Sequence, residues 1–532
     1  MLFFKSALNA LKEKRFMSST VIIIVVTVVA YIILMVAIGA YMSKRNLSTK
    51  DFYLGGRQLG PFVTAMSAEA SDMSSYLLMG VPGVALAGLV GMNGSFAEAI
   101  WTVAGLAIGT YINWLLVAKR LRIYSEEVEA HTVPGFFAKR YGRTDTGMIM
   151  IVAALIIIIF FVPYTASGFA SVGKLFNSLF GWNYHISMIV GAVIIATYTV
   201  LGGFLAASTT DFIQSIIMTF ALVIVVFFML YTVGGLNSAI SQAEAAVNGY
   251  FNLNGADGSY GFLPIVSMMS WGLGYFGMPH ILLRFMAIKD DRKLKLSRRI
   301  ASVWVVIAMG VAVFIGVIGY AFTSTMDLMD IEGFDPERIV IYVASAISDI
   351  GPLTAVIGGL IIAGILAATM STSDSQMLAA ASSVSENIVR NFIARDMSNK
   401  MSMLIARITV LVIAAIGVIF AWDPNSSVFR IVSFAWAGFG AAFGPLMLFS
   451  LFWKRTNKWG AFAGIFSGGA MVFIWKFEIS TIGGVWNIYE LMPAFIVSCI
   501  FIVVVSLVTG KPKPEIEEEF DHVNSIMKAK AK

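Results

Sequence analysis

One polar stretch decides how this chain must fold: SAEASDMSS, residues 67–75, in the middle of the apolar run 61–86. A helix of about 20 residues crosses the roughly 30 Å hydrocarbon core of a bilayer, so the run is long enough to span a membrane. Its centre carries two carboxylates and four serines, which are too polar to face lipid. The stretch therefore predicts a membrane helix whose middle faces protein, water or a ligand.

A second apolar run, 263–286, is interrupted in the same way by SWGLGYFGMP at 270–279. Glycine and proline weaken the helical hydrogen-bond ladder, and the carbonyls released there must be satisfied by protein, water or a ligand. Small residues also permit tight helix packing, which is the alternative interpretation of either run alone. Two interruptions at matching positions favour a pair of broken helices with a cation site between them.

The composition agrees with a membrane protein. Of the 532 residues, 58% are apolar and 13% are charged, against about 25% charged in ordinary soluble domains. The 37 Lys and Arg residues lie in short loops rather than in one stripe, which argues against nucleic acid as a partner. The single cysteine, Cys499, excludes an intrachain disulfide. Membrane lipid is therefore the expected surrounding of most of the chain.

Thirteen runs are long enough to be transmembrane helices, so the two termini are expected on opposite faces of the membrane. The predicted limits are 20–43, 61–86, 93–118, 147–172, 184–204, 211–235, 263–286, 300–324, 353–380, 403–422, 428–452, 458–477 and 488–509. Because basic loops stay cytoplasmic, the positions of Lys and Arg predict an N-terminus outside and a C-terminus inside the cell inner (plasma) membrane. The basic segment 1–16 conflicts with this orientation, and a start at Met17 would remove the conflict.

The spans are predicted to form an inverted repeat. Each interrupted run opens a block of five spans, 61–235 and 263–452, and the two blocks start from opposite faces. The other parts are an N-terminal extension at 1–19, a first span and cytoplasmic loop at 20–60, two C-terminal spans at 453–509, and a cytoplasmic tail at 510–532 that is short, charged and expected to be solvated. The sequence thus predicts an all-α membrane protein with a 5+5 core.

No catalytic pattern supports an enzyme. The run from Gly272 to Gly277 matches the dinucleotide pattern GxGxxG, but no strand–turn–helix unit precedes it. The sequence has no HExxH or CxxC pattern, and its four histidines are scattered. We therefore expect a transport protein rather than an enzyme.

Two places in the spans carry oxygen ligands that suit a small cation. Asp72 lies in the first interruption, with Glu69 one turn earlier on the same helix face. Near the end of span 353–380, Ala368, Ser371 and Thr372 are spaced i, i+3 and i+4, which aligns one carbonyl and two hydroxyls. Carbonyl and hydroxyl oxygens without a strong anion suit Na⁺ better than a divalent ion. The alternative is that these hydroxyls bond back to their own helix.

Three further charged residues lie in or near the predicted spans, and one of them, Asp211, has two interpretations. Asp211 follows Ser and Thr residues at the start of span 211–235, which is typical of a helix N-cap. Proximity to Ser371 and Asp374 would instead favour an ion path. Arg284 and Arg407 lie near predicted span ends and are expected to extend toward the membrane surface.

Aromatic residues gather at the interruptions: Tyr76, Tyr164, Trp271 and Tyr275. Rings in membrane bundles are commonly packing residues. Beside two helix breaks they are also suited to a small zwitterion, because a ring face attracts an ammonium and a helix N-terminus attracts a carboxylate.

Five sequence runs resemble the sodium:solute symporter family, most closely its sodium/proline symporters, and the resemblance extends from about residue 20 to residue 510. The runs are DFYLGGR at 51–57, ASDMS at 70–74, GGFLA at 202–206, WGLGYFG at 271–277 and FAWAGFGAAFGP at 434–445.

The resemblance implies a LeuT-like 5+5 inverted repeat with one extra span before it and two after it. It also implies Na⁺-coupled uptake of a small solute by alternating access. The matching sodium ligands would be the carbonyls of Ala70, Met73 and Ala368 and the hydroxyls of Ser371 and Thr372. Positions tied to coupling or to a second Na⁺ would be Arg57, Asp72, Asp211, Asp374 and Ser375. The solute-contacting positions would be Ser75, Tyr76, Tyr164, Trp271, Tyr275 and Pro279.

Four positions depart from the pattern of the proline members. Glu69 and Ser75 replace glycine, Tyr76 replaces tryptophan, and Met278 replaces glutamine. Proline is therefore the first expected solute, and another amino acid, a carboxylate or a sugar remains the alternative. A membrane sensor on the same fold would need an output domain, and none is visible in the sequence.

Overall fold

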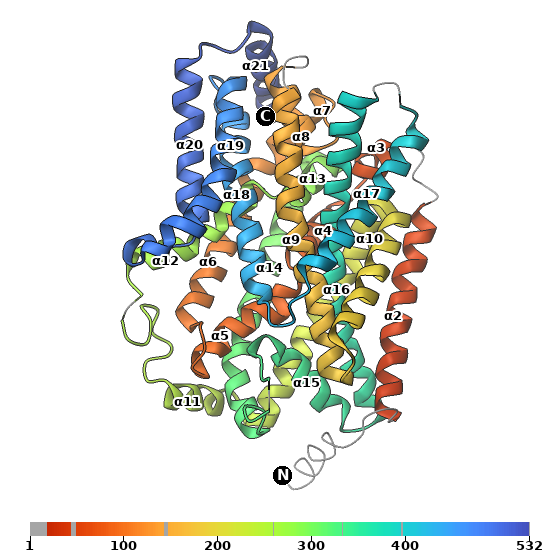
Figure 1. The fold of residues 1–532 in the computed structure, drawn as a ribbon, viewed down its shortest axis with the longest axis vertical. Coiled ribbons are helices and arrows are strands. Elements are labelled where there is room, and N and C mark those ends of the chain that lie inside the picture. The colour runs from red at the N-terminus through yellow and green to blue at the C-terminus, as the bar shows by residue number, and fades with distance from the viewer. Residues whose placement is uncertain are drawn as a thin grey trace.

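The computed structural model describes residues 19–43, 49–142, 147–258, 260–331, 333–394 and 397–530. Within these ranges the regular structure is helical, with one isolated β-bridge between Leu59 and Ile288. Figure 1 shows the long helices running roughly parallel along the vertical axis, as expected for a membrane bundle. The predicted all-α fold class is confirmed.

The first half of the bundle extends from α2 to α11. Its elements are α2 (Ser19–Ser43), α3 (Thr49–Leu54), η1 (Gly55–Arg57), α4 (Pro61–Asp72), η2 (Tyr76–Gly80), α5 (Val81–Leu89), α6 (Phe96–Ile112), η3 (Asn113–Val117), α7 (Ala118–Glu127), α8 (Val133–Tyr141), α9 (Gly147–Phe180), α10 (Tyr184–Val233) and α11 (Leu236–Ala246).

The second half extends from α12 to α21. Its elements are α12 (Phe262–Met269), η4 (Ser270–Phe276), α13 (Pro279–Ala287), η5 (Asp291–Lys293), α14 (Leu294–Thr325), η6 (Pro336–Arg338), α15 (Ile339–Ser348), α16 (Pro352–Ser382), η7 (Ser383–Ile393), α17 (Asn399–Phe420), α18 (Val428–Phe452), α19 (Lys458–Ile474), η8 (Trp475–Ile479), η9 (Ser480–Ile482), η10 (Gly484–Trp486), α20 (Leu491–Val508) and α21 (Pro514–Ala529).

The predicted thirteen spans are not all separate helices. Among the described residues, ten helices are long and apolar enough to cross a membrane, or eleven when α4 and 76–89 count as one bent span. The largest difference is α10, which takes in the predicted span 184–204 and the predicted span 211–235 as far as Val233. It contains one non-helical residue, Gly203, at φ 65° and ψ −173°. Glycine adopts this backbone conformation readily, so the chain changes direction there without an intervening loop.

The helices outside the repeat lie at the edges of the bundle. Figure 1 places α2 at one side and α19 with α20 at the other. The two interrupted segments lie inside: α4 packs on α10, α14 and α16, and η4 packs on α6 and α18. The polar centres of the broken helices are therefore shielded from lipid by neighbouring helices, as their composition requires.

The charged tail is not simply solvated. Residues 514–529 form α21, whose Phe520 and Val523 are buried, and this helix packs on α7. The Arg120 guanidinium lies 5.4 Å from the centre of the Phe520 ring. In Figure 1, α21 lies at the end of the bundle opposite to the start of α2.

Candidate functional site

The first helix break lies where the polar stretch predicted it. Helix α4 ends at Asp72, Met73 has a non-helical ψ of 69°, and the axis bends by 59° before the chain continues from Tyr76. The amide of Ser74 donates to the carbonyl of Asp72 at 2.9 Å instead of to that of Ala70, four residues back. The break therefore releases the Ala70 carbonyl from the helical ladder.

The released carbonyl meets the predicted hydroxyl pair on α16. The Ser371 hydroxyl donates to the Ala70 carbonyl at 2.7 Å and lies 3.3 Å from the Ala368 carbonyl. The Thr372 hydroxyl donates to the same Ala368 carbonyl at 3.2 Å. The structure thus brings four of the five predicted sodium ligands together from segments about 300 residues apart. The fifth, Met73, is fully buried in the adjoining break.

The second break also lies where the sequence predicted it. Helix α12 ends at Met269, the 3₁₀ segment η4 follows, and α13 starts at Pro279 after an extended Met278. The backbone of α18 approaches this break closely. A Cβ added to Gly277 would lie 2.2 Å from the Phe439 carbonyl oxygen, so only glycine fits there.

Asp72 joins the two breaks. Its Oδ2 accepts a hydrogen bond of 2.6 Å from the Tyr275 hydroxyl, which belongs to η4. Its backbone carbonyl accepts one of 3.3 Å from the Tyr164 hydroxyl on α9. Its other carboxylate oxygen, Oδ1, is buried without a hydrogen-bond partner among the described residues. Asp72 thus connects three elements of the predicted solute pocket.

The remaining predicted pocket residues lie around the same place. The rings of Tyr76 and Trp271 stack with centres 6.2 Å apart. The Ser75 hydroxyl accepts a hydrogen bond of 2.7 Å from that of Ser171 on α9. Pro279 is buried at the start of α13.

Three aromatic residues of this cluster were not among the sequence candidates. Trp271 packs on Phe429, Trp436 and Tyr489, with ring centres 5.3, 6.2 and 5.1 Å away. The Trp436 indole also donates to the Trp271 carbonyl at 2.7 Å. Trp436 lies in the family-like run 434–445, so its position in the sequence could have indicated a role at the pocket. Tyr489 lies near a predicted span end and carries no comparable signal.

The expectation for Arg284 is wrong. Its side chain is 1% exposed and pairs with Asp211 at 3.0 Å, both deep in the bundle. The Arg284 Nε donates to the Ser67 hydroxyl at 3.0 Å, and this hydroxyl donates to Asp211 Oδ2 at 2.7 Å. Asp211 lies inside the continuous helix α10, so the N-cap interpretation is also wrong. The Arg284 side chain stays in the bundle instead of extending to the membrane surface, because the buried Asp211 carboxylate requires a partner.

Arg284 also connects Asp211 to two other predicted coupling residues, Ser375 and Asp374. It donates to the Ser375 hydroxyl at 2.5 Å, and Ser375 donates to Asp374 Oδ1 at 2.9 Å. The second oxygen of Asp374 accepts a hydrogen bond from the Tyr198 hydroxyl. The result is one buried network with two carboxylates and a single guanidinium, behind the hydroxyl pair of α16. Arg284, Ser67 and Tyr198 are members of the network that were not among the sequence candidates. Arg284 could have been one of them, because any ionisable residue within a span is a functional candidate.

Comparison with known proteins identifies the family to which this chain belongs. The family model described as "Sodium:solute symporter family" matches residues 52–468. The chain belongs to the sodium:solute symporter family. It is 42% identical over 503 residues to the osmoregulated proline transporter OpuE of Bacillus subtilis, covering 94% of this chain and 98% of that protein. It is 38% identical over 494 residues to the high-affinity proline transporter PutP of the same organism, covering 93% and 100%.

A third relative agrees with this assignment, and two solved structures share the fold. Sodium/proline symporter 2 of Staphylococcus saprophyticus is 40% identical over 511 residues, covering 94% of this chain and 96% of that protein. The structure of a Na⁺-coupled sialic acid symporter matches with a TM-score of 0.76 at 17% identity, covering 92% of this chain and 99% of that one. The transporter Mhp1 matches with a TM-score of 0.52 at 14% identity, covering 89% and 98%. These two matches concern the fold, which is LeuT-like as the resemblance implied.

Arg57 of this symporter lies outside the buried network. It follows α3 with a positive φ of 57° and donates to the carbonyls of Ser125 and Ala130 at 3.0 and 2.9 Å. It also donates to the carbonyl of Met286 at the end of α13. Burial, with Arg122 nearby, lowers the pKa of Arg57 to about 10. Arg57 therefore fastens the loop before the first broken helix to the end of the second.

Glu69, one of the departures from the proline pattern, accepts hydrogen bonds from one neighbouring segment. Its Oε1 accepts hydrogen bonds from the Trp114 indole at 2.9 Å and from the Thr110 hydroxyl at 3.3 Å. Both donors belong to the α6 and η3 segment. This departure thus changes the packing behind α4, whereas Ser75 and Tyr76 change the lining of the pocket itself.

Proposed function

We propose that this symporter couples the downhill entry of Na⁺ to the uptake of proline by alternating access. The observation that carries the proposal is the bond from the Ser371 hydroxyl to the Ala70 carbonyl, because it joins a broken helix to α16 through oxygen atoms. The three relatives are named as proline transporters or as a sodium/proline symporter, and this supports proline as the solute. The basic loops support a plasma-membrane orientation with the N-terminus outside.

The proposed sodium site uses five oxygens: the carbonyls of Ala70, Met73 and Ala368 and the hydroxyls of Ser371 and Thr372. The hydroxyl oxygens keep lone pairs for a cation while their hydrogens turn toward other acceptors. Neutral oxygens in this number suit a monovalent hard cation. Na⁺ bound there would hold α4 against α16, so it would favour one arrangement of the two halves over the other.

The proposed proline pocket lies beside this site. Its members would be Ser75, Tyr76, Tyr164, Trp271, Tyr275 and Pro279. The stacked faces of Tyr76 and Trp271 offer a place for the ammonium of a small zwitterion, and the start of α13 offers a helix N-terminus for its carboxylate.

Asp72 supplies the proposed coupling between ion and solute. It is two residues from the proposed ligand Ala70, and it holds Tyr275 through its carboxylate and Tyr164 through its carbonyl. Ordering the break by Na⁺ would thus position two pocket side chains, and by reciprocity proline would raise the affinity for Na⁺.

The buried network around Asp211, Asp374 and Ser375 is our proposed place for a second Na⁺ or for coupling. Two carboxylates face one guanidinium, and Oδ1 of Asp211 is buried without a hydrogen-bond partner in the described part of the chain. A cation there would offset the remaining negative charge. Arg57 would contribute to coupling from elsewhere, by fastening the loop before α4 to the end of α13.

Uptake by proteoliposomes tests the function directly. We expect labelled proline to accumulate with an inward Na⁺ gradient and not with an equal K⁺ gradient, and excess unlabelled proline to inhibit that uptake. Accumulation without Na⁺ would refute the coupling. Na⁺-dependent uptake of another amino acid, a carboxylate or a sugar, with no inhibition by proline, would refute the solute and keep the coupling.

Substitutions in α16 test the ion site. Ser371→Ala and Thr372→Ala each remove one proposed oxygen ligand. We expect each to raise the Na⁺ concentration for half-maximal uptake by about 10- to 150-fold, since a lost contact to a charge costs about 1.5–3 kcal/mol. Ser382→Ala is the matched control: Ser382 is buried on the same helix, and its hydroxyl donates to the Ala379 carbonyl of that helix at 2.8 Å. Equal effects at all three positions would refute the assignment.

A further inference from the structure

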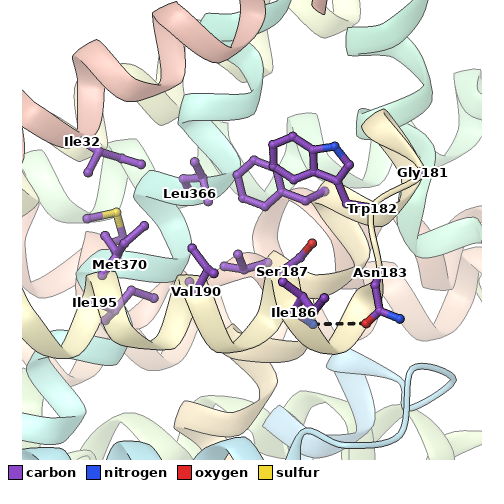
Figure 2. Close-up of a pocket in the computed structure, with 14 residues that line it drawn as sticks. Ile32, Gly181, Trp182, Asn183, Ile186, Ser187, Val190, Ile195, Leu366 and Met370 are labelled. Carbon is purple, nitrogen blue, oxygen red and sulfur yellow. Dashed lines mark hydrogen bonds between the residues drawn. The ribbon is translucent and has the colours of Figure 1, made fainter. Parts of the chain in front are cut away.

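An apolar cavity of about 440 Å³ lies apart from the transport site, between α2, α9, α10 and α16. It is lined by Ile32 of α2, Val172 and Phe176 of α9, the loop 181–183, six residues of α10 between Ile186 and Ile195, and Leu366 and Met370 of α16. Figure 2 shows it extending along α10, with Trp182 and Asn183 at one end and Met370 with Ile195 at the other. We call it the α10 groove.

The α10 groove opens to the face of the protein that contacts lipid. Its rim residues Trp182, Ile186 and Val190 are 40, 65 and 52% exposed, although all are apolar or aromatic. Its floor residues Leu366 and Met370 are 4 and 2% exposed. All four helices around it are candidate membrane spans or parts of them. The groove is therefore continuous with the protein's hydrocarbon boundary, and its occupant must be hydrocarbon.

The length and the polarity of the groove match one leaflet of a bilayer. From Ile186 to Ile195 the helix rises about 14 Å, which is close to half of the roughly 30 Å hydrocarbon core. The end at the α9–α10 loop carries a tryptophan and an asparagine, and tryptophan is typical of the membrane–water interface. The other end is apolar. This order, polar at the surface and apolar toward the centre, is that of a phospholipid.

A polar atom of the groove points to the same ligand. The Ser187 hydroxyl lines the cavity and is buried, with 5% of the residue exposed, and it has no hydrogen-bond partner among the described residues. In Figure 2 its oxygen points from α10 toward the cavity. A buried hydroxyl without a partner costs free energy, and an ester carbonyl of a lipid is an acceptor at about this depth.

We propose that the α10 groove binds one acyl chain of a phospholipid from the leaflet next to the α9–α10 loop, with the lipid ester near Ser187. The chain lies along α10 and reaches Leu366 and Met370, which bulk lipid does not contact. It supplies the dispersion contacts that these floor side chains lack on the cavity side.

Photolabelling tests this proposal. The full chain is reconstituted in phosphatidylcholine vesicles that contain a small share of phosphatidylcholine with a diazirine on its acyl chain, and labelled residues are identified by mass spectrometry after irradiation. We expect label on Leu366 and Met370 as well as on Val193, which is 59% exposed on the outer side of α10. Label on Val193 without label on the two floor residues would overturn the proposal.

Three variants separate groove binding from general lipid contact. Val190→Trp adds bulk at the rim of the groove and should remove the label from Leu366 and Met370, whereas the matched Val193→Trp should retain it. Ser187→Ala leaves the space open and should lower the floor label about two- to fivefold, the effect of one hydrogen bond. Equal floor labelling in Val190→Trp and Val193→Trp would overturn the proposal, and unchanged labelling in Ser187→Ala would overturn the ester contact.

Discussion

Replacing Arg284 by methionine should strongly destabilise the protein, because it removes the only guanidinium of the buried network. Arg284 pairs with Asp211 at 3.0 Å, donates to Ser67 and Ser375 at 3.0 and 2.5 Å, and lies 5.0 Å from the centre of the Phe204 ring. Methionine keeps much of the apolar stem but leaves Asp211 buried without its cation. Removing one partner of a buried pair costs about 3–5 kcal/mol, so we expect a loss of that size in unfolding free energy.

The assay is SDS-induced unfolding in mixed micelles, followed by tryptophan fluorescence, on four proteins: the wild type, Arg284→Met, Asp211→Asn and the double variant. Asp211→Asn removes the charge that needs a partner, so the double variant should recover at least about 2 kcal/mol relative to the sum of the single losses, a coupling typical of contacting residues. The recovery is the decisive quantity, since a purely steric defect would not show it. Additive losses would refute the pairing as the source of the cost.

Two further substitutions test the geometry of the breaks. Tyr275→Phe removes the hydrogen bond to Asp72. We expect it to raise the KM for proline by about 10- to 150-fold with less effect on stability, because a hydrogen bond to a charged group contributes about 1.5–3 kcal/mol. An unchanged KM in a proline uptake assay would contradict that role. Gly277→Ala places a Cβ 2.2 Å from the Phe439 carbonyl and should lower the melting temperature in detergent, whereas Gly310→Ala, with no atom within 4 Å of the added Cβ, should not. Equal melting temperatures for both variants would show that the backbones at the break separate without cost.

The two broken helices could be predicted because the physical requirement is local. A stretch such as residues 67–75 cannot face lipid, and a run with the glycines and proline of 270–279 cannot keep its full hydrogen-bond ladder. The structure places both interruptions as predicted, with the bend after Asp72 and the restart at Pro279. The spacing of Ala368, Ser371 and Thr372 was likewise sufficient to align three oxygens on one face of a single helix.

The number of separate spans was predicted less well, because it depends on backbone conformation, which hydropathy does not report. The predicted spans 184–204 and 211–235 are parts of one helix, and the change of direction depends on a positive φ at Gly203. A glycine in a helix is common, and only the packing around it decides whether it stays helical.

Sequence alone determined the solvent of this protein, its helical class and the positions of its polar interruptions, because burial in lipid constrains each segment separately. Only the tertiary structure decided which residues, distant in the chain, contact one another. Arg284 reads as a residue near a span end, yet it lies beside Asp211, 73 positions away in the chain, and Ser371 meets Ala70 across 301 positions. A charged side chain such as that of Arg284 can extend to the membrane surface or pair with a buried carboxylate. Which of the two occurs depends on which helices pack together, and the sequence of one segment does not determine that packing.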